Sequence, residues 1–287
     1  MTLGSFTLPF ASSLRRLFGN RAMLFGAIIL LVVLLAAIFA PWIAPYAPNK
    51  LSIVNKLKGP SAAHIFGTDE FGRDILSRIM SGAGVSTTVS VCSVLFALLA
   101  GTSIGAICGY AGGWFDRLAA MLIDALMAFP GLLLALGIMT VVGPSKWGVV
   151  VALGLAYTPS VSRIARGAAL SLRQRDFVVA SQTMGNSGAW TLLRHVLPHC
   201  VAPLLVFSTS LFGSALLAES ALSFLGLGVP APEPTWGGML ADGRTAIDQA
   251  IWVVLFPGAA ISLALFGINL FGDGVRDLLD PRMKGGM

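Results

Sequence analysis

The residues with the clearest capacity for chemistry lie in one short segment, residues 64–78, with the sequence HIFGTDEFGRDILSR. The segment combines three carboxylates with two arginines in a chain of which only 11% of the residues are charged. Such groups can pair with one another and accept hydrogen bonds from the loop backbone, or they can form a charged surface for a partner. We keep both readings for this motif, whose residues are Gly67, Thr68, Asp69, Gly72, Arg73 and Asp74.

Two further carboxylates, Asp124 and Glu219, stand in strongly apolar surroundings. A charge inside a membrane is costly, so such a residue is expected to face inward and is a functional candidate. We favour a structural hydrogen-bonding role for each carboxylate and keep a position on a substrate path as the alternative.

Metal and cofactor chemistry find little support in the sequence. His195 and His199 are four residues apart, which suits two metal ligands on one helix face, but Pro198 intervenes and no carboxylate is near. The three cysteines fall in or beside apolar stretches, where thiols behave as small apolar groups. The chain contains no G-x-x-x-x-G-K-[ST] phosphate loop and no H-E-x-x-H motif. We therefore expect no metal, no bound cofactor and no catalysis in this chain, and ATP hydrolysis only in a partner.

The composition is typical of a membrane protein. Of the 287 residues 56% are hydrophobic, and the mean hydropathy is +0.83, whereas roughly a quarter of the residues in a soluble domain are charged. A helix of about 20 apolar residues crosses a bilayer core about 30 Å thick. Six such stretches predict an all-α, polytopic protein with spans at about 23–43, 85–109, 118–142, 147–164, 201–225 and 250–271.

The predicted spans form one domain, residues 23–272, between an N-terminal segment, 1–22, and a tail, 273–287. The first span exceeds the apolar core of a signal peptide, so we interpret it as an uncleaved anchor. Placing both termini in the cytoplasm puts 12 of the 19 lysines and arginines inside, among them Arg163 and Arg166. The net charge of +6 then reflects topology, and we expect no nucleic-acid partner.

Small residues and prolines predict the shape of the spans. Glycines recur at every fourth position in the second span, which puts Gly101, Gly105 and Gly109 on one helix face where another helix can approach. We expect that neighbour to belong to the same chain, with a second membrane subunit as the alternative. Prolines inside three spans remove backbone hydrogen bonds and predict kinks at Pro130, Pro159 and Pro257.

The predicted cytoplasmic loop, about 165–200, is too polar to cross the bilayer and too short to form a domain. Helical spacing gives it one stripe, and Gly185 followed by Asn186 ends that helix before a second amphipathic stretch. The stripe consists of Phe177, Ala180, Ser181 and Met184. Two short helices with an exposed apolar stripe need a partner, so this loop is a candidate coupling surface.

This loop also resembles one known from a transporter family. The spacing of Ala180, Gly185 and Leu197–Pro198 is similar to the EAA loop of binding-protein-dependent ABC importer permeases. The residues that depart from the consensus of that loop are Val179, Ser181 and His195.

Other segments resemble the peptide and nickel branch of these permeases, and they follow one another in the expected order. They are APWIAPYAP, FGTDEFGRDILSR, GYAGGWFDR, AFPGLLLAL, SFLGLGVPAPEPTWGGML and NLFGDGVRDLLDPR. Met121 and Gly84 stand where that branch has arginines. We therefore expect Asp124 to lack the ion-pair partner that the family supplies three residues earlier.

The resemblance implies a type I ABC importer permease-like fold with six spans, as in the shorter, C-type permease subunit of the bacterial inner membrane. It implies as partners the membrane lipid, a second homologous permease, two cytoplasmic ATPases that bind ATP and Mg²⁺, and an extracytoplasmic substrate-binding protein. The ATPase-coupling residues that it implies are Arg175, Asp176, Phe177, Ala180, Met184 and Gly185. The external loop, about 44–84, would carry the 64–78 motif near the mouth that receives the binding protein.

The function implied by the resemblance is that of a permease subunit that imports dipeptides, oligopeptides or a related small solute and forms half of the translocation path. Nickel or a metal chelate is the alternative cargo. A secondary transporter driven by protons through Asp124 or Glu219 is the alternative from another class, and it would work without ATP.

Overall fold

The computed structural model describes residues 20–279, so most of the predicted N-terminal segment and the end of the predicted tail lie outside the described residues. Within this range the chain is helical, and a single isolated β-bridge joins Thr68 to Asp74. The elements are α2 (Arg21–Ile43), η1 (Ile53–Asn55), α3 (Ile75–Ala111), α4 (Gly113–Met127), α5 (Gly131–Val142), α6 (Lys146–Arg173), α7 (Asp176–Thr183), α8 (Gly188–Thr191), η2 (Leu192–Val196), α9 (Leu197–Phe224), α10 (Trp236–Gly243) and α11 (Trp252–Leu279).

Five of the described elements are long and apolar enough to cross a membrane. They are α2, α3, α6, the helix that runs from Gly188 through α9 to Phe224, and α11. Helices α4 and α5 meet this condition only together, and they are bent by 88° at the break between them. The all-α class with up to six spans is confirmed, and the kink predicted at Pro130 is a full break that divides the predicted span at about 118–142 into two helices. The break falls at Pro130, because proline removes a backbone donor and disfavours helix for the residue before it.

Several helices extend beyond the apolar stretches that predicted them. Helix α3 begins at Ile75 and not at 85, so the last ten residues of the predicted external loop are helical. Helix α6 continues to Arg173, past the predicted end of its span at 164. The length of an apolar stretch reflects the thickness of the bilayer, whereas the ends of a helix are set by capping residues, which can lie outside that stretch. Asp74 provides such a cap, because its side chain accepts a hydrogen bond from the N–H of Ser77 at 2.8 Å.

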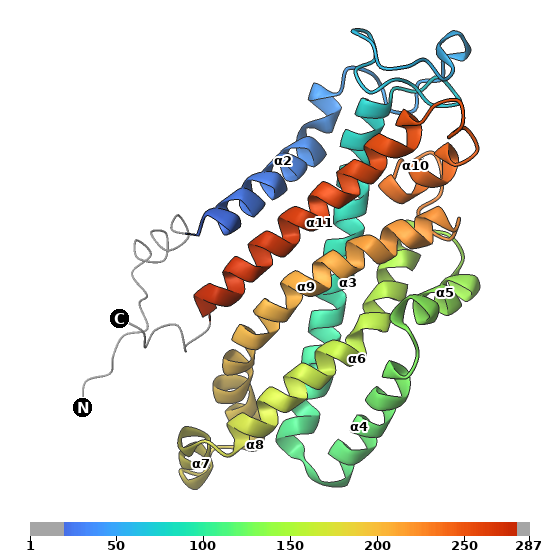
Figure 1. Cartoon of the computed structure of the whole chain (residues 1–287). Coiled ribbons are helices and arrows are strands. Elements are labelled where there is room, and N and C mark those ends of the chain that lie inside the picture. Colours follow the sequence, from blue (N-terminus) through green and yellow to red (C-terminus); the bar gives the residue numbers. More distant parts are fainter. Residues whose placement is uncertain (1–19, 280–287) are drawn as a thin grey trace.

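The long helices run side by side from one end of the molecule to the other. In Figure 1, α11, α9 and α6 lie next to one another with α3 behind them, and α2 lies beside α11. Helix α10 and the loop of residues 44–74 are at one end of the bundle, and α7 and α8 are at the opposite end. The two motifs singled out in the sequence therefore lie at opposite ends of the bundle.

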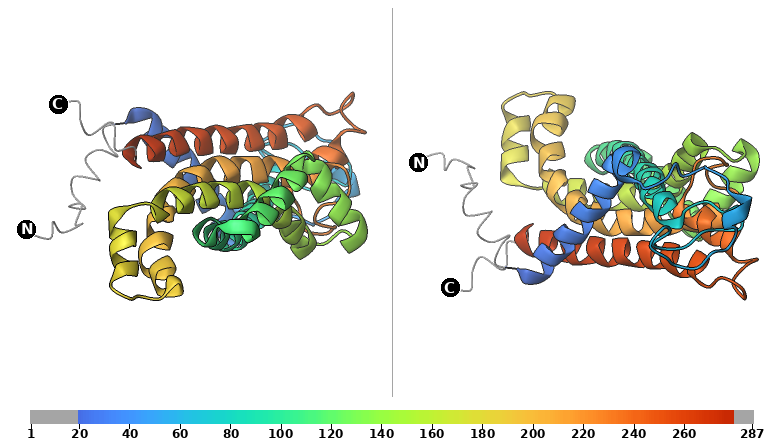
Figure 2. Two further views of the ribbon diagram at one scale, coloured as in Figure 1. Left: turned by 90° about the horizontal axis from the view of Figure 1, so that it is seen from below. Right: turned by 90° about the horizontal axis from the view of Figure 1, so that it is seen from above.

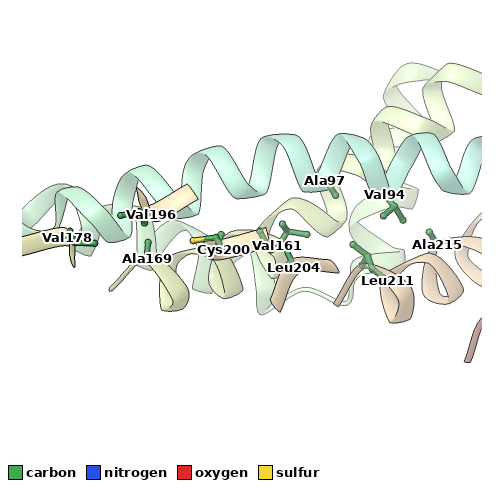
Figure 3. Packing of buried hydrophobic residues seen from close by; sticks show 11 residues of the cluster. Val94, Ala97, Val161, Ala169, Val178, Val196, Cys200, Leu204, Leu211 and Ala215 are labelled. Atoms are coloured by element: carbon green, nitrogen blue, oxygen red, sulfur yellow. The ribbon is translucent and has the colours of Figure 1, made fainter. Parts of the chain in front are cut away.

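The largest apolar cluster joins α3, α6 and α9 and continues toward α7. Figure 3 shows Val94 and Ala97 on α3 and Leu204 and Leu211 on α9, and the row of side chains continues to Val178 on α7. Because Val178 is fully buried, α7 is packed against the end of the bundle and is not a free loop.

The glycine stripe of α3 allows α6 to pack against it at backbone distance. A Cβ atom at Gly101 would lie 2.8 Å from the carbonyl oxygen of Thr158, and one at Gly109 would lie 2.6 Å from that of Arg166. A Cβ atom at Gly105 would collide with the carbonyl oxygen of Ser162. The stripe thus packs inside the chain, which confirms the prediction of an intrachain neighbour.

Replacing Gly105 with alanine should separate α3 from α6 and destabilise the bundle. We expect Gly105→Ala to lower the stability of the detergent-solubilised protein by about 2 kcal/mol or more, because a well-packed core cannot absorb the extra methyl group. The matched control is Gly137→Ala in α5, where a Cβ atom meets nothing within 4 Å and alanine should gain up to about 1 kcal/mol. Thermal unfolding measures both variants, and equal midpoints would contradict this packing account.

Candidate functional site

The candidate coupling loop folds as a short helical hairpin at one end of the bundle. Helix α6 ends at Arg173, and α7 begins at Asp176 after only two further residues. We call residues 176–191 the coupling hairpin. Both views of Figure 2 show it projecting away from the bundle. Its turn contains Gly185 with φ of +83°, a left-handed conformation that strains β-branched residues.

The inner face of the coupling hairpin is held by a small polar contact and an apolar one. The hydroxyl groups of Ser181 and Thr191 are 3.0 Å apart, and the amide of Asn186 donates to the Ser181 hydroxyl at 3.2 Å. Val178 lies on the same buried face, three residues before Ser181. The expectation that Ser181 shares the exposed stripe is therefore wrong, because helical spacing puts it with Val178.

The predicted coupling residues are all exposed; they lie on the outer face of the coupling hairpin or, for Arg175, directly before it. They are Arg175, Asp176, Phe177, Ala180, Met184 and Gly185. Met184 is 79% exposed and Phe177 is 39% exposed. Met184 stands clear of the bundle and part of the Phe177 ring is exposed beside it, so the two side chains offer apolar surface suited to a protein partner.

The two histidines of the loop pack against Phe177. The ring of Phe177 is stacked on that of His199, with the ring centres 5.0 Å apart, and meets His195 edge-on at 6.3 Å. The Nδ1 atom of His199 donates to the carbonyl oxygen of His195 at 2.6 Å. These contacts hold the base of the coupling hairpin. In the part of the chain that the structure describes, no group of three or more His, Cys, Asp or Glu side chains is placed to hold a metal ion.

At the opposite end, residues 64–78 form an elbow that satisfies most of its own charges. Asp69 accepts hydrogen bonds from the N–H groups of Phe71 and Arg73, both at 2.9 Å, and pairs with Arg73 Nε at 2.6 Å. Asp74 caps α3 and lies 2.9 Å from His64 Nδ1. This geometry is what the structural reading of the motif requires, while its role in docking a partner stays a prediction.

The elbow is tied to α10 by charges that the sequence did not connect. Arg73 and Arg78 both approach Asp242 of α10, at 3.2 and 3.5 Å, and Arg78 also lies 3.7 Å from Asp69. Together with the loop of residues 226–235, Arg73, Arg78 and Asp242 line a cavity of about 360 Å³ on this end of the molecule. The elbow, α3 and α10 therefore form one rigid unit at the predicted external mouth.

Glu219 is fully buried and is hydrogen-bonded by hydroxyl groups of the same chain. The hydroxyls of Ser223 and Ser220 donate to its carboxyl oxygens at 2.9 and 3.4 Å, and Ser86 of α3 bonds to the same carboxyl. Ser86 in turn accepts from the N–H of Trp236 at the start of α10, at 3.4 Å. Glu219 thus joins α9, α3 and α10, which matches the structural role that we favoured for it.

Asp124 differs from Glu219, because its side chain is largely exposed and forms an ion pair. Arg163 of α6 lies 2.6 Å from it. The side chain of Asp124 is 65% exposed and that of Arg163 is 52% exposed. As expected, Asp124 has no ion-pair partner at position 121, which is a methionine; its partner, Arg163, comes from another helix. One bidentate pair, Asp116 with Arg166 at 2.5 and 2.8 Å, also joins α4 to α6.

Sequence reasoning missed Arg163 and Asp242 as site residues for different reasons. Arg163 was assigned to the cytoplasmic flank because its apolar stretch ends near 164, although small residues at Ala165 and Ala169 continue the helical spacing and could have indicated a longer helix. No local pattern marks Asp242, whose partner Arg73 is 169 residues away in the sequence.

Comparison with protein families gives two matches. The family described as the binding-protein-dependent transport system inner membrane component matches residues 101–285. The N-terminal transmembrane domain of oligopeptide transport permease C matches residues 9–60.

Curated relatives are similar over nearly the whole chain. A putative peptide transport system permease protein of Brucella abortus is 46% identical over 280 residues, covering 96% of this chain and 93% of the relative. A dipeptide transport system permease protein of Alkalihalophilus pseudofirmus is 42% identical, covering 96% and 91%. A glutathione transport system permease protein of Escherichia coli is 40% identical, covering 96% and 92%.

A solved structure shares the fold at low sequence identity. It is an inward-facing conformation of the MetNI methionine ABC transporter, with a TM-score of 0.58 and 15% identity, covering 70% of this chain and 96% of that one. At this identity the likeness speaks for the fold alone.

Removing the carboxyl group of Glu219 should destabilise the bundle more than removing its charge. Glu219→Leu leaves the buried hydroxyls of Ser220 and Ser223 without an acceptor, so we expect a loss of about 3 kcal/mol in unfolding free energy. Glu219→Gln keeps one acceptor oxygen and should lose about 1 kcal/mol. Thermal unfolding in detergent distinguishes the two, and a Leu variant as stable as the wild type would refute the structural role.

Proposed function

The chain belongs to the family of binding-protein-dependent transport system inner membrane components, and from that membership we propose that it is one permease half of an ATP-driven importer of peptides. In this proposal it pairs with a second, homologous permease, and two cytoplasmic ATPases bind below the pair. An extracytoplasmic binding protein delivers the cargo. Both termini lie in the cytoplasm, and the chain holds no cofactor, because ATP and Mg²⁺ are bound by the ATPases.

The observation that carries this proposal is the exposed coupling hairpin on a membrane bundle without a phosphate loop. Phe177 and Met184 present apolar surface beyond the bundle, and α7 follows α6 after two residues. A force on α7 therefore reaches a membrane-crossing helix directly. In the proposed assembly an ATPase holds the hairpin, with Phe177 as the apolar anchor and Arg175 and Asp176 as flanking polar contacts.

ATP drives transport only if it binds two states of the assembly with different affinity. Closure of the two ATPases brings their coupling hairpins together and tips α6 and the helices packed on it from an inward-facing to an outward-facing arrangement. The contact at backbone distance between α6 and α3 supports this step, because a movement of α6 cannot leave α3 behind.

We assign the elbow and α10 to the outer mouth. The groups of the motif hold the shape of this mouth, since Thr68, Asp69 and Asp74 are buried and bonded within the chain. Gly67, Gly72 and Arg73 complete the turn, so docking of a binding protein depends on the surface that this rigid unit presents. The path itself runs past Asp124, whereas Glu219 supports it from inside the bundle.

Peptides are the proposed cargo because three relatives that match nearly the whole chain are named as peptide, dipeptide and glutathione permeases. Glutathione is itself a tripeptide, so the three names share one chemical class: short chains with a free carboxylate and a free amino group.

The direct test is purification of the tagged chain in mild detergent, identification of the subunits that accompany it, and uptake assays in proteoliposomes. We expect a second permease, ATPases and a binding protein that holds a peptide, and uptake that needs ATP. Full uptake by the chain alone, driven by a proton gradient without ATP, would establish the secondary transporter in its place. Nickel on the binding protein would establish the metal alternative.

A substitution at the turn of the coupling hairpin should separate folding from coupling. Gly185→Val forces a β-branched residue into a left-handed conformation, which costs about 1–2 kcal/mol locally, while no neighbour stands within 4 Å of the new Cβ atom. We expect substrate-stimulated ATPase activity of the complex to fall about tenfold with the bundle still folded.

The matched control is Gly185→Asn, because asparagine tolerates the left-handed conformation. It should keep near-normal coupling. Normal substrate-stimulated ATPase activity in the valine variant would refute the assignment of this turn.

A further inference from the structure

We propose that the ion pair of Asp124 and Arg163 lines the translocation path and binds the two charged ends of a passing peptide. This inference rests on the proposed function, because it takes a peptide as the cargo. It adds Arg163, which the sequence had placed in the cytoplasm, and it assigns a chemical task to each member of the pair.

The depth of the pair within the bundle is the first argument. Arg163 is ten residues before the end of α6 at Arg173 and 17 residues after its start at Lys146. At a rise of 1.5 Å per residue these separations are about 15 and 25 Å. Helix α6 is about 40 Å long and a bilayer core is about 30 Å thick, so a core centred on α6 would include the pair.

The exposure of the pair at that depth is the second argument. More than half of each side chain is exposed, although the two charges are only 2.6 Å apart. Hydrocarbon offers neither hydrogen bonds nor solvation to these groups, so exposed charges in a spanning segment face a water-filled cavity or polar protein. In this proposal the environment is water, and this side of α4 and α6 faces the water-filled path of the assembly.

Further polar groups on α6 and α9 are the third argument. Ser160 lies one turn before Arg163 and is only partly buried, and Tyr157 donates its hydroxyl to the carbonyl oxygen of Ser214 on α9 at 3.1 Å. Ser210, one turn before Ser214, lines a polar cavity of about 270 Å³ between α9 and α11. The Tyr157–Ser214 hydrogen bond thus links the helix that carries Arg163 to polar residues of α9.

The chemistry of the pair matches that of a peptide with free ends. A guanidinium group binds a carboxylate with two parallel hydrogen bonds, and a carboxylate accepts hydrogen bonds from an ammonium group. When the peptide separates the pair, its carboxylate contacts Arg163 and its ammonium group contacts Asp124, so every charge keeps a partner. Because the closed pair competes with the cargo, binding stays weak enough for the peptide to leave.

Glu219 shows what a purely structural carboxylate looks like in the same bundle. It is fully buried, and serine hydroxyls of its own chain hold both of its oxygens. Asp124, in contrast, has one partner and an open side, so it can exchange that partner for a ligand.

The first test is thiol accessibility in the assembled complex in proteoliposomes. The three native cysteines, Cys92, Cys108 and Cys200, are replaced by alanine, and a single cysteine is introduced as Ser160→Cys or, as the control, Leu122→Cys. Leu122 is 59% exposed on the opposite side of α4 from Asp124. The probe is a negatively charged, membrane-impermeant methanethiosulfonate, which reacts with thiols in water.

We expect the thiol at position 160 to react at least about tenfold faster than that at 122, because only a thiol in water forms the reactive thiolate. ATP with vanadate, which traps the closed ATPases, should change its rate of reaction. Equal, slow reaction at both positions would overturn the proposal, because it would place the pair in lipid or in a sealed interface.

The second test removes both charges and keeps the hydrogen bond. In Asp124→Asn/Arg163→Gln the amides can still pair, so a merely structural role predicts wild-type uptake. We expect uptake of dialanine to fall about tenfold, which corresponds to the loss of one charged hydrogen bond, with the thermal unfolding midpoint unchanged. Wild-type uptake in this variant would overturn the proposal.

The two proposals fail in different ways. If the wild-type complex imports no dialanine with ATP, the proposed function fails, and the cargo assigned here fails with it. If the wild type imports dialanine and the double variant does so equally well, only the inference about Asp124 and Arg163 is refuted.

Discussion

The structure depends on one constraint: the bilayer core contains no water, so each polar group there must be bonded inside the chain or turned to a partner or a path. Glu219 meets the constraint in the first way, through serine hydroxyls on its own helix and on α3. Asp124 and Arg163 meet it in the second way, since they are paired and open. The same constraint separates helix surfaces that can face lipid from those that need a polar neighbour.

Close packing lets a movement of one helix in this bundle be transmitted to its neighbours. Helix α6 meets α3 through glycines at backbone distance, carries one member of each ion pair to α4, and ends two residues before the coupling hairpin. The apolar cluster that runs from Val94 to Val178 packs the coupling hairpin continuously against the core of the bundle. A displacement of the coupling hairpin is therefore passed to α6 and to α3, which packs against it.

The sequence predicted those features that local patterns encode. Apolar stretches predicted the helical class and the spans, and the spacing of Gly101, Gly105 and Gly109 predicted a close intrachain contact. The proline pattern predicted the bend at Pro130, whereas the bounds of the helices were predicted less well, because helix caps depend on single residues. The pairing of Arg163 with Asp124 could not be read at all, since it joins residues 39 positions apart in the sequence through a packing angle that no local pattern sets.

The central claim is that a separate ATPase grips the coupling hairpin, and a photo-cross-linking side chain at position 184 tests it most directly. Met184 is 79% exposed on the coupling hairpin, and Trp114, at the start of α4, is 74% exposed and provides the matched control. The account predicts that irradiation of the working complex joins position 184 to a nucleotide-hydrolysing subunit and position 114 far less. Absence of that product from position 184 in a complex that still transports would contradict the account.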